Sequence, residues 1–501
     1  MPAAGISACL LFLALGAGLR SAPAGTPVAP PPPPQGGYDQ LADDITSFIA
    51  TSNRTERATW GIVVQSLSTG ERLFERNPGA LLVPGSTLKL ITAAVAAAAV
   101  GWDYAFETTV DAHGAIDGGS LRGDLVITGS GDPSPLGPGG DDFPAVLVSA
   151  LRERGVARIE GRIIGDDDAL DEPRPGLGWQ WDDLGTVSGV VAGALNIAEN
   201  TMRVTVSPGA AEGAPTKIAL PPEVEDAVLI NDSTTGPVGS PRTLWAEHRP
   251  GDAGLTIAGT LAAGARRATL TVAAGNPTLW FARVVRSRLA AAGIAVTGPA
   301  VDIDDVPPTR PAAATPGDRI LTYTSPPLSA IVAPMLKESV NLYAESALRL
   351  AAGPSGPRST EASLAAEGAQ LEAWGVPADA YRIVDGSGMS RHNLITAEAL
   401  VRLLTVQHPA SGASPFVDAL SVAGVDGRLA ARMKSTPAAD NARAKTGSMT
   451  RLQSLAGYVT TRDGDTLAFA IIVNNFSTRP SAVVRAIDRI VVRLAKLSAK
   501  P

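Results

Sequence analysis

The chain has 501 residues, of which 45% are hydrophobic and 18% are charged, and its formal net charge at pH 7 is -7. A domain usually takes about 100–200 residues, so this length predicts more than one domain. The acidic balance provides no positive field for nucleic acid, and we expect no nucleic-acid partner. The one cysteine is Cys9, so the rest of the chain has no disulfide, thiolate metal site or cysteine nucleophile. The four histidines have no metal-binding spacing, and we expect no metal and no cofactor.

The first residues form an apolar leader, ISACLLFLALGAGL, followed by the small-residue segment RSAPAG. This pattern predicts a secretory signal over residues 1–25, with a short membrane anchor as the alternative. Residues 26–37 contain a run of prolines, typical of a stiff linker. We therefore expect an exported protein, located in the periplasm or another extracytoplasmic cell-wall space.

The folded part is expected to begin at residue 38 with an amphipathic helix and a hairpin, WGIVVQSL and ERLFERN around the turn STG. An alanine-rich helix follows within residues 84–100, PGSTLKLITAAVAAAAV, and it carries Ser86 and Lys89 at its start. Positions three apart lie on the same side of a helix, so this lysine can reach the serine hydroxyl. The alternative is that Ser86 only caps the helix.

The sequence pattern changes over residues 105–311, where short segments of alternating apolar and polar residues are separated by glycine and proline turns. This pattern predicts an insertion of two smaller β-rich domains, with one helix near its end. Helical segments return after it, among them LSAIVAPMLKES, NLYAESALRLAAG and TAEALVRLLTVQH.

Three strands are predicted near the end of the chain, in ARAKTGSM, LQSLAGYVTT and DTLAFAIIVNNF, and they can pair with the early hairpin in one sheet. The final helix has one apolar stripe, which favours packing on that sheet, with peripheral association with a membrane surface as the alternative. The stripe consists of Val483, Ile487, Ile490, Leu494 and Leu497.

Three short motifs occur in a fixed order along the chain. Ser86-x-x-Lys89 begins a helix, Ser339-Val340-Asn341 lies at the junction of two helices, and Lys445-Thr446-Gly447 lies on a strand. Each motif is weak alone, but their order and contexts together form the set found in β-lactamases and penicillin-binding proteins.

The chain resembles the D-alanyl-D-alanine carboxypeptidase/endopeptidases among the low-molecular-mass penicillin-binding proteins, in the branch with a large insertion between the first two motifs. Further segments fit this branch, including LVITGSGDPS, GWQWDDL, VAGALNIAEN, ESVNLYAESALRLAAG and DGSGMSRHNLIT. The resemblance implies an α/β fold, with a transpeptidase/β-lactamase-like domain in which helices flank an antiparallel sheet. That domain would comprise residues 38–104 and 312–501. Val340 departs from the usual S-D-N motif of the family.

An unassisted serine hydroxyl is a poor nucleophile, so the chemistry requires a base beside it. We expect Lys89 to activate Ser86, with the amides of Ser86 and Ser448 holding the oxyanion. Ser339 would relay a proton to the leaving amine, and Asn341 would orient the substrate.

The substrate carboxylate would be bound on the strand that carries the third motif. We expect Lys445 to provide the positive charge there, and the segment Thr446, Gly447 and Ser448 to contact the substrate.

The resemblance also implies a pocket for the side chain of the stem peptide, formed by Asp183 and Arg391. The expected partners are peptidoglycan stem peptides, with β-lactam antibiotics as covalent inhibitors, and the oligomeric state is left open. The alternatives are a β-lactamase and a non-catalytic sensor of β-lactams or cell wall.

Overall fold

The computed structural model describes residues 39–51, 55–172, 174–224, 228–247, 254–307, 317–354, 358–408 and 414–498. The expected signal segment and proline-rich linker lie outside the described residues. Within the described ranges, no helix combines the length and the apolar character needed to cross a membrane.

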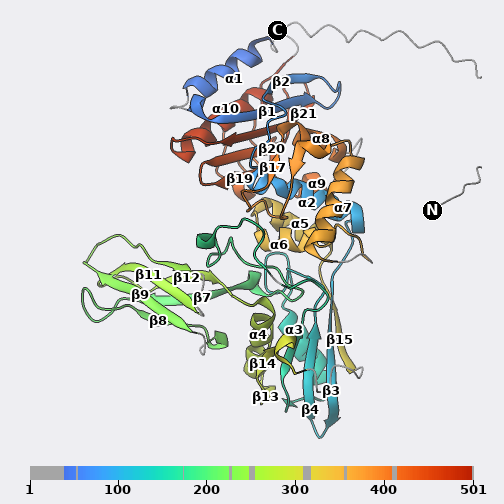
Figure 1. The fold of residues 1–501 in the computed structure, drawn as a ribbon, viewed down its shortest axis with the longest axis vertical. Helices are drawn as coiled ribbons and strands as arrows, with labels where there is room; N and C mark the ends of the chain where they lie inside the picture. The colour runs from blue at the N-terminus through green and yellow to red at the C-terminus, as the bar shows by residue number, and fades with distance from the viewer. Residues whose placement is uncertain are drawn as a thin grey trace, which may run out of the picture. The chain divides into compact units, whose positions relative to one another are not determined.

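A six-stranded antiparallel sheet is built from both ends of the chain, in the order β18-β19-β20-β21-β1-β2 (Figure 1). Its strands are β1 (Thr59–Ser66), β2 (Arg72–Arg76), β18 (Ser421–Val422), β19 (Arg443–Met449), β20 (Leu452–Thr460) and β21 (Thr466–Asn474). The early strand β1 pairs with the late strand β21 along its whole length. The predicted pairing of the early hairpin with the terminal strands is therefore confirmed.

The sheet has a hydrophobic layer on each face because side chains alternate along its strands. In β21, Phe469 and Ile471 join the cluster formed with α1 (Asp39–Thr51) and α10 (Pro480–Ala495). Ala470 and Ile472 instead join the cluster of the opposite face. That cluster is formed with α2 (Lys89–Val100), α5 (Leu328–Lys337), α6 (Asn341–Leu348), α7 (Thr360–Ala373), α8 (Ala397–Gln407) and α9 (Pro415–Asp418).

The apolar stripe of the last helix packs on the sheet. All five stripe residues are at most 1% exposed, and they belong to the cluster shared with α1 and the strands. The predicted packing is confirmed, and the alternative of a helix lying on a membrane is wrong because its apolar face is already covered.

The insertion begins with a seven-stranded sheet of mixed direction, flanked by α3 (Phe143–Glu153) and α4 (Pro277–Ala291). Its strands are β3 (Glu107–Asp117), β4 (Ser120–Thr128), β5 (Arg158–Ile159), β6 (Ile163–Asp166), β13 (Ala295–Val296), β14 (Ala300–Asp302) and β15 (Asp318–Thr324). This part is therefore mixed α/β, although we expected β-rich modules. Because β15 pairs with β3, the inserted sheet extends to Thr324, beyond the expected boundary at residue 311.

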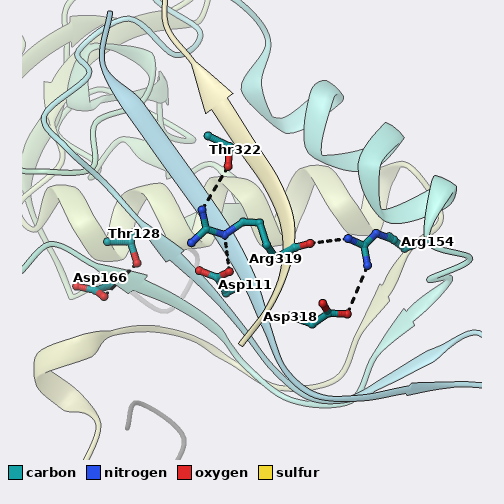
Figure 2. Close-up of polar contacts among 7 residues, drawn as sticks. All are labelled: Asp111, Thr128, Arg154, Asp166, Asp318, Arg319 and Thr322. Carbon is teal, nitrogen blue, oxygen red and sulfur yellow. Dashed lines mark hydrogen bonds and ion pairs between the residues drawn. The ribbon is translucent and has the colours of Figure 1, made fainter. Parts of the chain in front are cut away.

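Side-chain contacts attach β15 to its neighbours, as Figure 2 shows. Arg319 donates to Asp111 on β3 and to Thr322 on its own strand. Arg154, just after α3, donates to the carbonyl oxygen of Arg319 at 2.6 Å and also contacts Asp318. These bonds add to the backbone pairing of β15 with β3.

The rest of the insertion contains two three-stranded sheets, ordered β10-β11-β9 and β12-β7-β8. Their strands are β7 (Thr201–Ser207), β8 (Lys217–Ala219), β9 (Leu229–Gly236), β10 (Trp245–Glu247), β11 (Leu255–Ala262) and β12 (Ala268–Ala273). One continuous hydrophobic cluster includes residues of all three inserted sheets. The short β16 (Tyr381–Arg382) and β17 (Leu394–Ile395) pair with each other and lie outside the insertion.

Candidate active site

Ser86 and Lys89 lie where a single 3-10 turn, Gly85–Leu88, continues into α2. Lys89 Nζ is 3.0 Å from Ser86 Oγ. Neither the turn nor the helix has a side-chain capping hydrogen bond at its start. The capping interpretation of Ser86 is therefore wrong, and its hydroxyl faces the amine.

Lys89 is fully buried, and two further oxygens hold its amine. Nζ lies 2.7 Å from Asn341 Oδ1 and 2.7 Å from the carbonyl oxygen of Ser387. A neutral amine has two N–H groups and one lone pair. When the two N–H groups donate to these fixed acceptors, the lone pair is left facing Ser86. This is the orientation that a base needs to accept the serine proton.

Burial lowers the pKa of Lys89 to about 7. Removing an ammonium from water disfavours its charged form, and the positive charge of Arg428 acts in the same direction. The negative charges of Glu345 and Asp385 oppose this shift. A substantial fraction of the amine is thus unprotonated near neutral pH.

The second and third motifs meet through Lys445 and Ser339. Lys445 is fully buried on β19, and its Nζ donates to Ser339 Oγ at 2.9 Å and to the carbonyl oxygen of Thr446 at 2.7 Å. Burial lowers the pKa of Lys445 well below its usual value, and the charge of Lys89 adds to this. The two amines are therefore near enough to repel each other when both are protonated.

Ser339 has a left-handed backbone, with φ of 66°. A residue other than glycine in this region costs on the order of 1–3 kcal/mol, and such strain often occurs at functional sites. Here the left-handed residue lies between the end of α5 and the start of α6. The turn brings the Ser339 hydroxyl within hydrogen-bonding distance of Lys445. Asn341 begins the next helix and accepts a hydrogen bond from Lys89.

Glycines let the serine turn approach strand β19 closely. A Cβ on Gly447 would lie 2.6 Å from the carbonyl oxygen of Pro84 and 3.1 Å from the amide nitrogen of Ser86. A Cβ on Gly85 would lie 3.5 Å from the amide nitrogen of Ser448. The amides of Ser86 and Ser448 therefore lie on two backbone segments in direct contact, an arrangement suited to a pair of oxyanion donors.

The two remaining predicted substrate contacts on β19, Thr446 and Ser448, differ in exposure. Thr446 is partly buried, whereas Ser448 is exposed and its hydroxyl accepts a hydrogen bond from Gln453 Nε2 at 2.8 Å. The Ser454 hydroxyl on the next strand donates to the carbonyl oxygen of Pro84 at 2.6 Å. This bond attaches the serine turn to the sheet, and sequence reasoning missed it.

Asp183 and Arg391 lie near each other, but the structure does not pair them. Arg391 donates to Gln180 Oε1 at 3.0 Å and to the carbonyl oxygen of Thr450 at 2.9 Å. Burial and the charge of Asp182 raise the pKa of Asp183, and the charge of Arg391 opposes that rise. The two charges therefore influence each other, but they form no direct ion pair among the described residues.

The insertion contacts one motif residue, Asn341, and the neighbouring segment that contains Asp385 and Ser390. Asn341 Nδ2 donates to the carbonyl oxygen of Ser188 at 2.8 Å. Trp179 Nε1 donates to Asp385 at 2.9 Å, and the Ser390 hydroxyl donates to the carbonyl oxygen of Leu177 at 2.5 Å. Sequence reasoning missed these partners, since two of the acceptors are backbone carbonyls and Trp179 and Asp385 lie 206 residues apart in the chain.

A group of three carboxylates that could hold a cation lies elsewhere among the described residues. The carboxylates of Asp167, Asp302 and Asp304 have oxygens within 4.8 Å of one another. Thr278 donates to Asp167, and Asn276 donates to Asp302. All five residues belong to the insertion and none to the three motifs, so the site chemistry derived above does not involve them.

The arrangement agrees with similarities to known proteins. The sequence profile of the D-Ala-D-Ala carboxypeptidase 3 (S13) family matches residues 41–497. D-alanyl-D-alanine carboxypeptidase of Actinomadura sp. (strain R39) is 32% identical over 469 residues, covering 91% of this chain and 85% of that protein. D-alanyl-D-alanine carboxypeptidase DacB of Haemophilus influenzae is 26% identical over 436 residues, covering 85% of this chain and 88% of that protein. The crystal structure of penicillin binding protein 4 from Haemophilus influenzae matches with a TM-score of 0.77 at 25% identity, covering 90% of this chain and 99% of that one.

Proposed function

This chain belongs to the D-Ala-D-Ala carboxypeptidase 3 (S13) family of serine-type peptidases, and from that premise we propose how its residues perform the reaction. Ser86 attacks the carbonyl between the two terminal D-alanines of a peptidoglycan stem peptide. The observation that carries this assignment is the position of Lys89, whose Nζ lies 3.0 Å from Ser86 Oγ with its other hydrogen-bonding directions taken by Asn341 and Ser387.

In the acylation step, Lys89 accepts the proton of the Ser86 hydroxyl while Ser86 Oγ bonds to the peptide carbonyl carbon. The tetrahedral intermediate collapses by breaking the C–N bond, and D-alanine leaves after its amine takes up the proton that Lys89 accepted. Ser339 is our candidate for handing on that proton, since its hydroxyl accepts a hydrogen bond from Lys445. Water then attacks the acyl carbon, the ester C–O bond breaks, the shortened peptide leaves with a new carboxylate, and a proton from the water restores the Ser86 hydroxyl.

The amides of Ser86 and Ser448 stabilise the negative oxygen of the intermediate. Losing one such donor costs about 100- to 1000-fold in rate in other enzymes. The substrate carboxylate is held by the hydroxyls of Thr446 and Ser448 in the field of Lys445. Asp183 and Arg391 contact the ends of the stem-peptide side chain, an amine and a carboxylate in a diaminopimelate-like residue.

The same site predicts covalent inhibition by β-lactams, because their strained amide offers Ser86 an equivalent carbonyl. Opening the ring leaves the leaving amine attached, so the acyl-enzyme persists when water attacks slowly. Since peptidoglycan lies outside the cytoplasm, the proposal places the enzyme in the periplasm or an equivalent cell-wall space. Cleavage of cross-links as an endopeptidase would use the same acyl-enzyme.

The experiment is to measure D-alanine release from a stem pentapeptide ending in D-Ala-D-Ala, for the wild type and for Ser86→Ala. We expect release by the wild type and none above background by the variant, with circular dichroism showing that both are folded. Release undiminished in the variant would overturn the assignment of Ser86. A β-lactam adduct that hydrolyses rapidly, without any D-alanine release, would indicate a β-lactamase instead.

A further inference from the structure

Helix α6 presents two polar side chains to the catalytic lysine region, one turn apart. Asn341 begins the helix, and Glu345 follows four residues later on the same face. Asn341 Oδ1 contacts Lys89 Nζ directly, at 2.7 Å. Glu345 is buried, and neither the sequence motifs nor the mechanism above gives it a role.

The Glu345 carboxylate binds the peptide that in turn binds the lysine. It accepts hydrogen bonds from the amide of Ser387 at 2.8 Å and from the amide of Gly386 at 3.3 Å. The carbonyl oxygen of the same Ser387 lies 2.7 Å from Lys89 Nζ. One residue thus connects the carboxylate and the amine through its two backbone polar groups.

Gly386 allows this segment to lie against the helix. A Cβ at this position would be 2.5 Å from the carbonyl oxygen of Ala344 and 2.9 Å from Leu348 Cβ. Both atoms belong to α6, which cannot shift without moving Asn341. The contact between the segment and the helix is therefore built into the backbone.

We propose that Glu345 is a positioning residue for the reaction, which holds the Ser387 carbonyl on Lys89 and sets the pH at which Lys89 becomes a base. The inference rests on the proposed function, since it assigns the residue that governs the proposed base. Glu345 itself does not contact Ser86.

Charged groups from several elements face Lys89. Besides Glu345 on α6, they are Asp385 in the segment before β17, Arg428 in the 3-10 turn Gly427–Leu429, and Lys445 on β19. Asp385 accepts hydrogen bonds from four donors, in Trp179, Gly388, Ser390 and Asn393. Replacing Asp385 would disturb all four of these hydrogen bonds, whereas Glu345 accepts only from Gly386 and from the amide and side chain of Ser387, and so offers a cleaner substitution.

Glu367 on α7 is a second buried glutamate that experiences the charge of Glu345, and it differs from Glu345 in its hydrogen bonding. It is also buried, but both of its carboxylate oxygens lack a hydrogen-bond partner among the described residues. Burial raises the pKa of Glu367 to about 8, so it is largely neutral at pH 7. Its replacement by glutamine therefore changes little charge near neutral pH.

The direction of the effect follows from the charges. A negative Glu345 favours the ammonium form of Lys89 and so raises its pKa. Burial and the charge of Asp385 raise the pKa of Glu345, while hydrogen bonds from the Ser387 side chain and from the two amides favour its charged form. Without this carboxylate, Lys89 loses its proton at lower pH. Glu345 also lines a cavity of about 480 Å³, together with Asp385 and Trp179.

The test is the pH dependence of acylation of the full chain by a chromogenic cephalosporin, compared among the wild type, Glu345→Gln and Glu367→Gln. In the wild type the rate should rise with pH through about 7 as Lys89 loses its proton. For E345Q we expect this rise to move to lower pH by on the order of one unit, with a lower maximal rate because the base is weaker. For E367Q the rise should stay at the wild-type pH.

A purely structural role for Glu345 would lower the rate of E345Q at every pH without moving the rise, and that result would overturn the inference. If E345Q does not fold, Glu345→Ala serves in its place, since it also removes the carboxylate and its charge. Its rise should likewise move to lower pH, and an unmoved rise would overturn the inference. A wild type that is not acylated at Ser86 would instead overturn the proposed function itself.

Discussion

The motif residues and the proposed recognition residues Asp183 and Arg391 lie in contrasting environments. Lys89 and Lys445 are both 0% exposed, and each amine is held by fixed oxygen acceptors. Arg391 is only partly buried, binds Gln180 and a backbone carbonyl, and forms no ion pair with Asp183 in the described structure. Burial shifts pKa values and fixes geometry, which suits proton transfer. Partial exposure leaves charge free for a ligand, which suits recognition.

This comparison predicts that substitutions in the two regions have different consequences. Changes among the motif residues should abolish acylation by every substrate, because all substrates use the same nucleophile and base. Changes at the Asp183–Arg391 pair should affect only substrates whose side chains carry matching charges. The three predictions that follow run from the largest expected effect to the smallest.

Lys89→Met should have the largest effect, because methionine fills a buried site but cannot accept a proton. We expect the rate of acylation by benzylpenicillin to fall by about a thousandfold, within the range that a general base contributes. The measurement is the second-order acylation rate at pH 8. Lys434→Met, which replaces an exposed lysine, is the matched control and should acylate at the wild-type rate. A rate for K89M within a few-fold of the wild type would contradict the role of Lys89.

Gly447→Ala should have an intermediate effect. The new Cβ would meet Ser454 Oγ at 2.2 Å, the carbonyl oxygen of Pro84 at 2.6 Å and the amide nitrogen of Ser86 at 3.1 Å. Two of these atoms are backbone, so the serine turn and β19 must separate and the two oxyanion amides must move apart. We expect acylation to slow by about a hundredfold.

The control for this prediction is Gly79→Ala, because a Cβ at Gly79 would have no heavy atom within 4 Å. The G79A variant should acylate like the wild type. If Gly447→Ala acylated as fast as Gly79→Ala, the contact between the turn and the strand would not position the oxyanion donors.

Asp183→Asn should have the smallest effect, and only with a charged substrate. We expect kcat/KM for D-alanine release from a stem peptide bearing a side-chain amine to fall about tenfold, as one charge contact is lost. Acylation by benzylpenicillin, which lacks that amine, should be unchanged. Asp182→Asn, at the exposed neighbouring position, is the control. An equal loss with both ligands would place Asp183 in the general architecture of the site instead.

Much of the fold could be predicted from the sequence, and the α/β class and the family resemblance are confirmed. The strands β1, β20 and β21 are apolar runs bounded by turn residues, and α10 has an apolar stripe typical of a helix packed on a sheet. The insertion was harder to predict, because its sheet pairs strands from distant parts of the chain. Nothing local in β15 indicates that its partner is β3, so the expected boundary fell too early.

The candidate site divides in a similar way. The three motifs were recognisable from residue types and order, and the structure brings them together around Lys89 and Lys445. Their roles stay predictions, as does the pocket formed by Asp183 and Arg391. The Ser387 carbonyl and the Glu345 carboxylate were missed, because a backbone acceptor has no sequence signature and a glutamate on a helix usually indicates a solvated face. Only the spacing of four residues from Asn341 could have pointed to Glu345.

The most direct test of the central claim is to locate the covalent adduct. The full chain would be incubated with a labelled penicillin, digested, and analysed by peptide mass spectrometry, with Ser86→Ala treated in parallel. The account predicts a single adduct on the peptide that contains Ser86, absent from the variant. An adduct on another residue, or no adduct in the folded wild type, would contradict it.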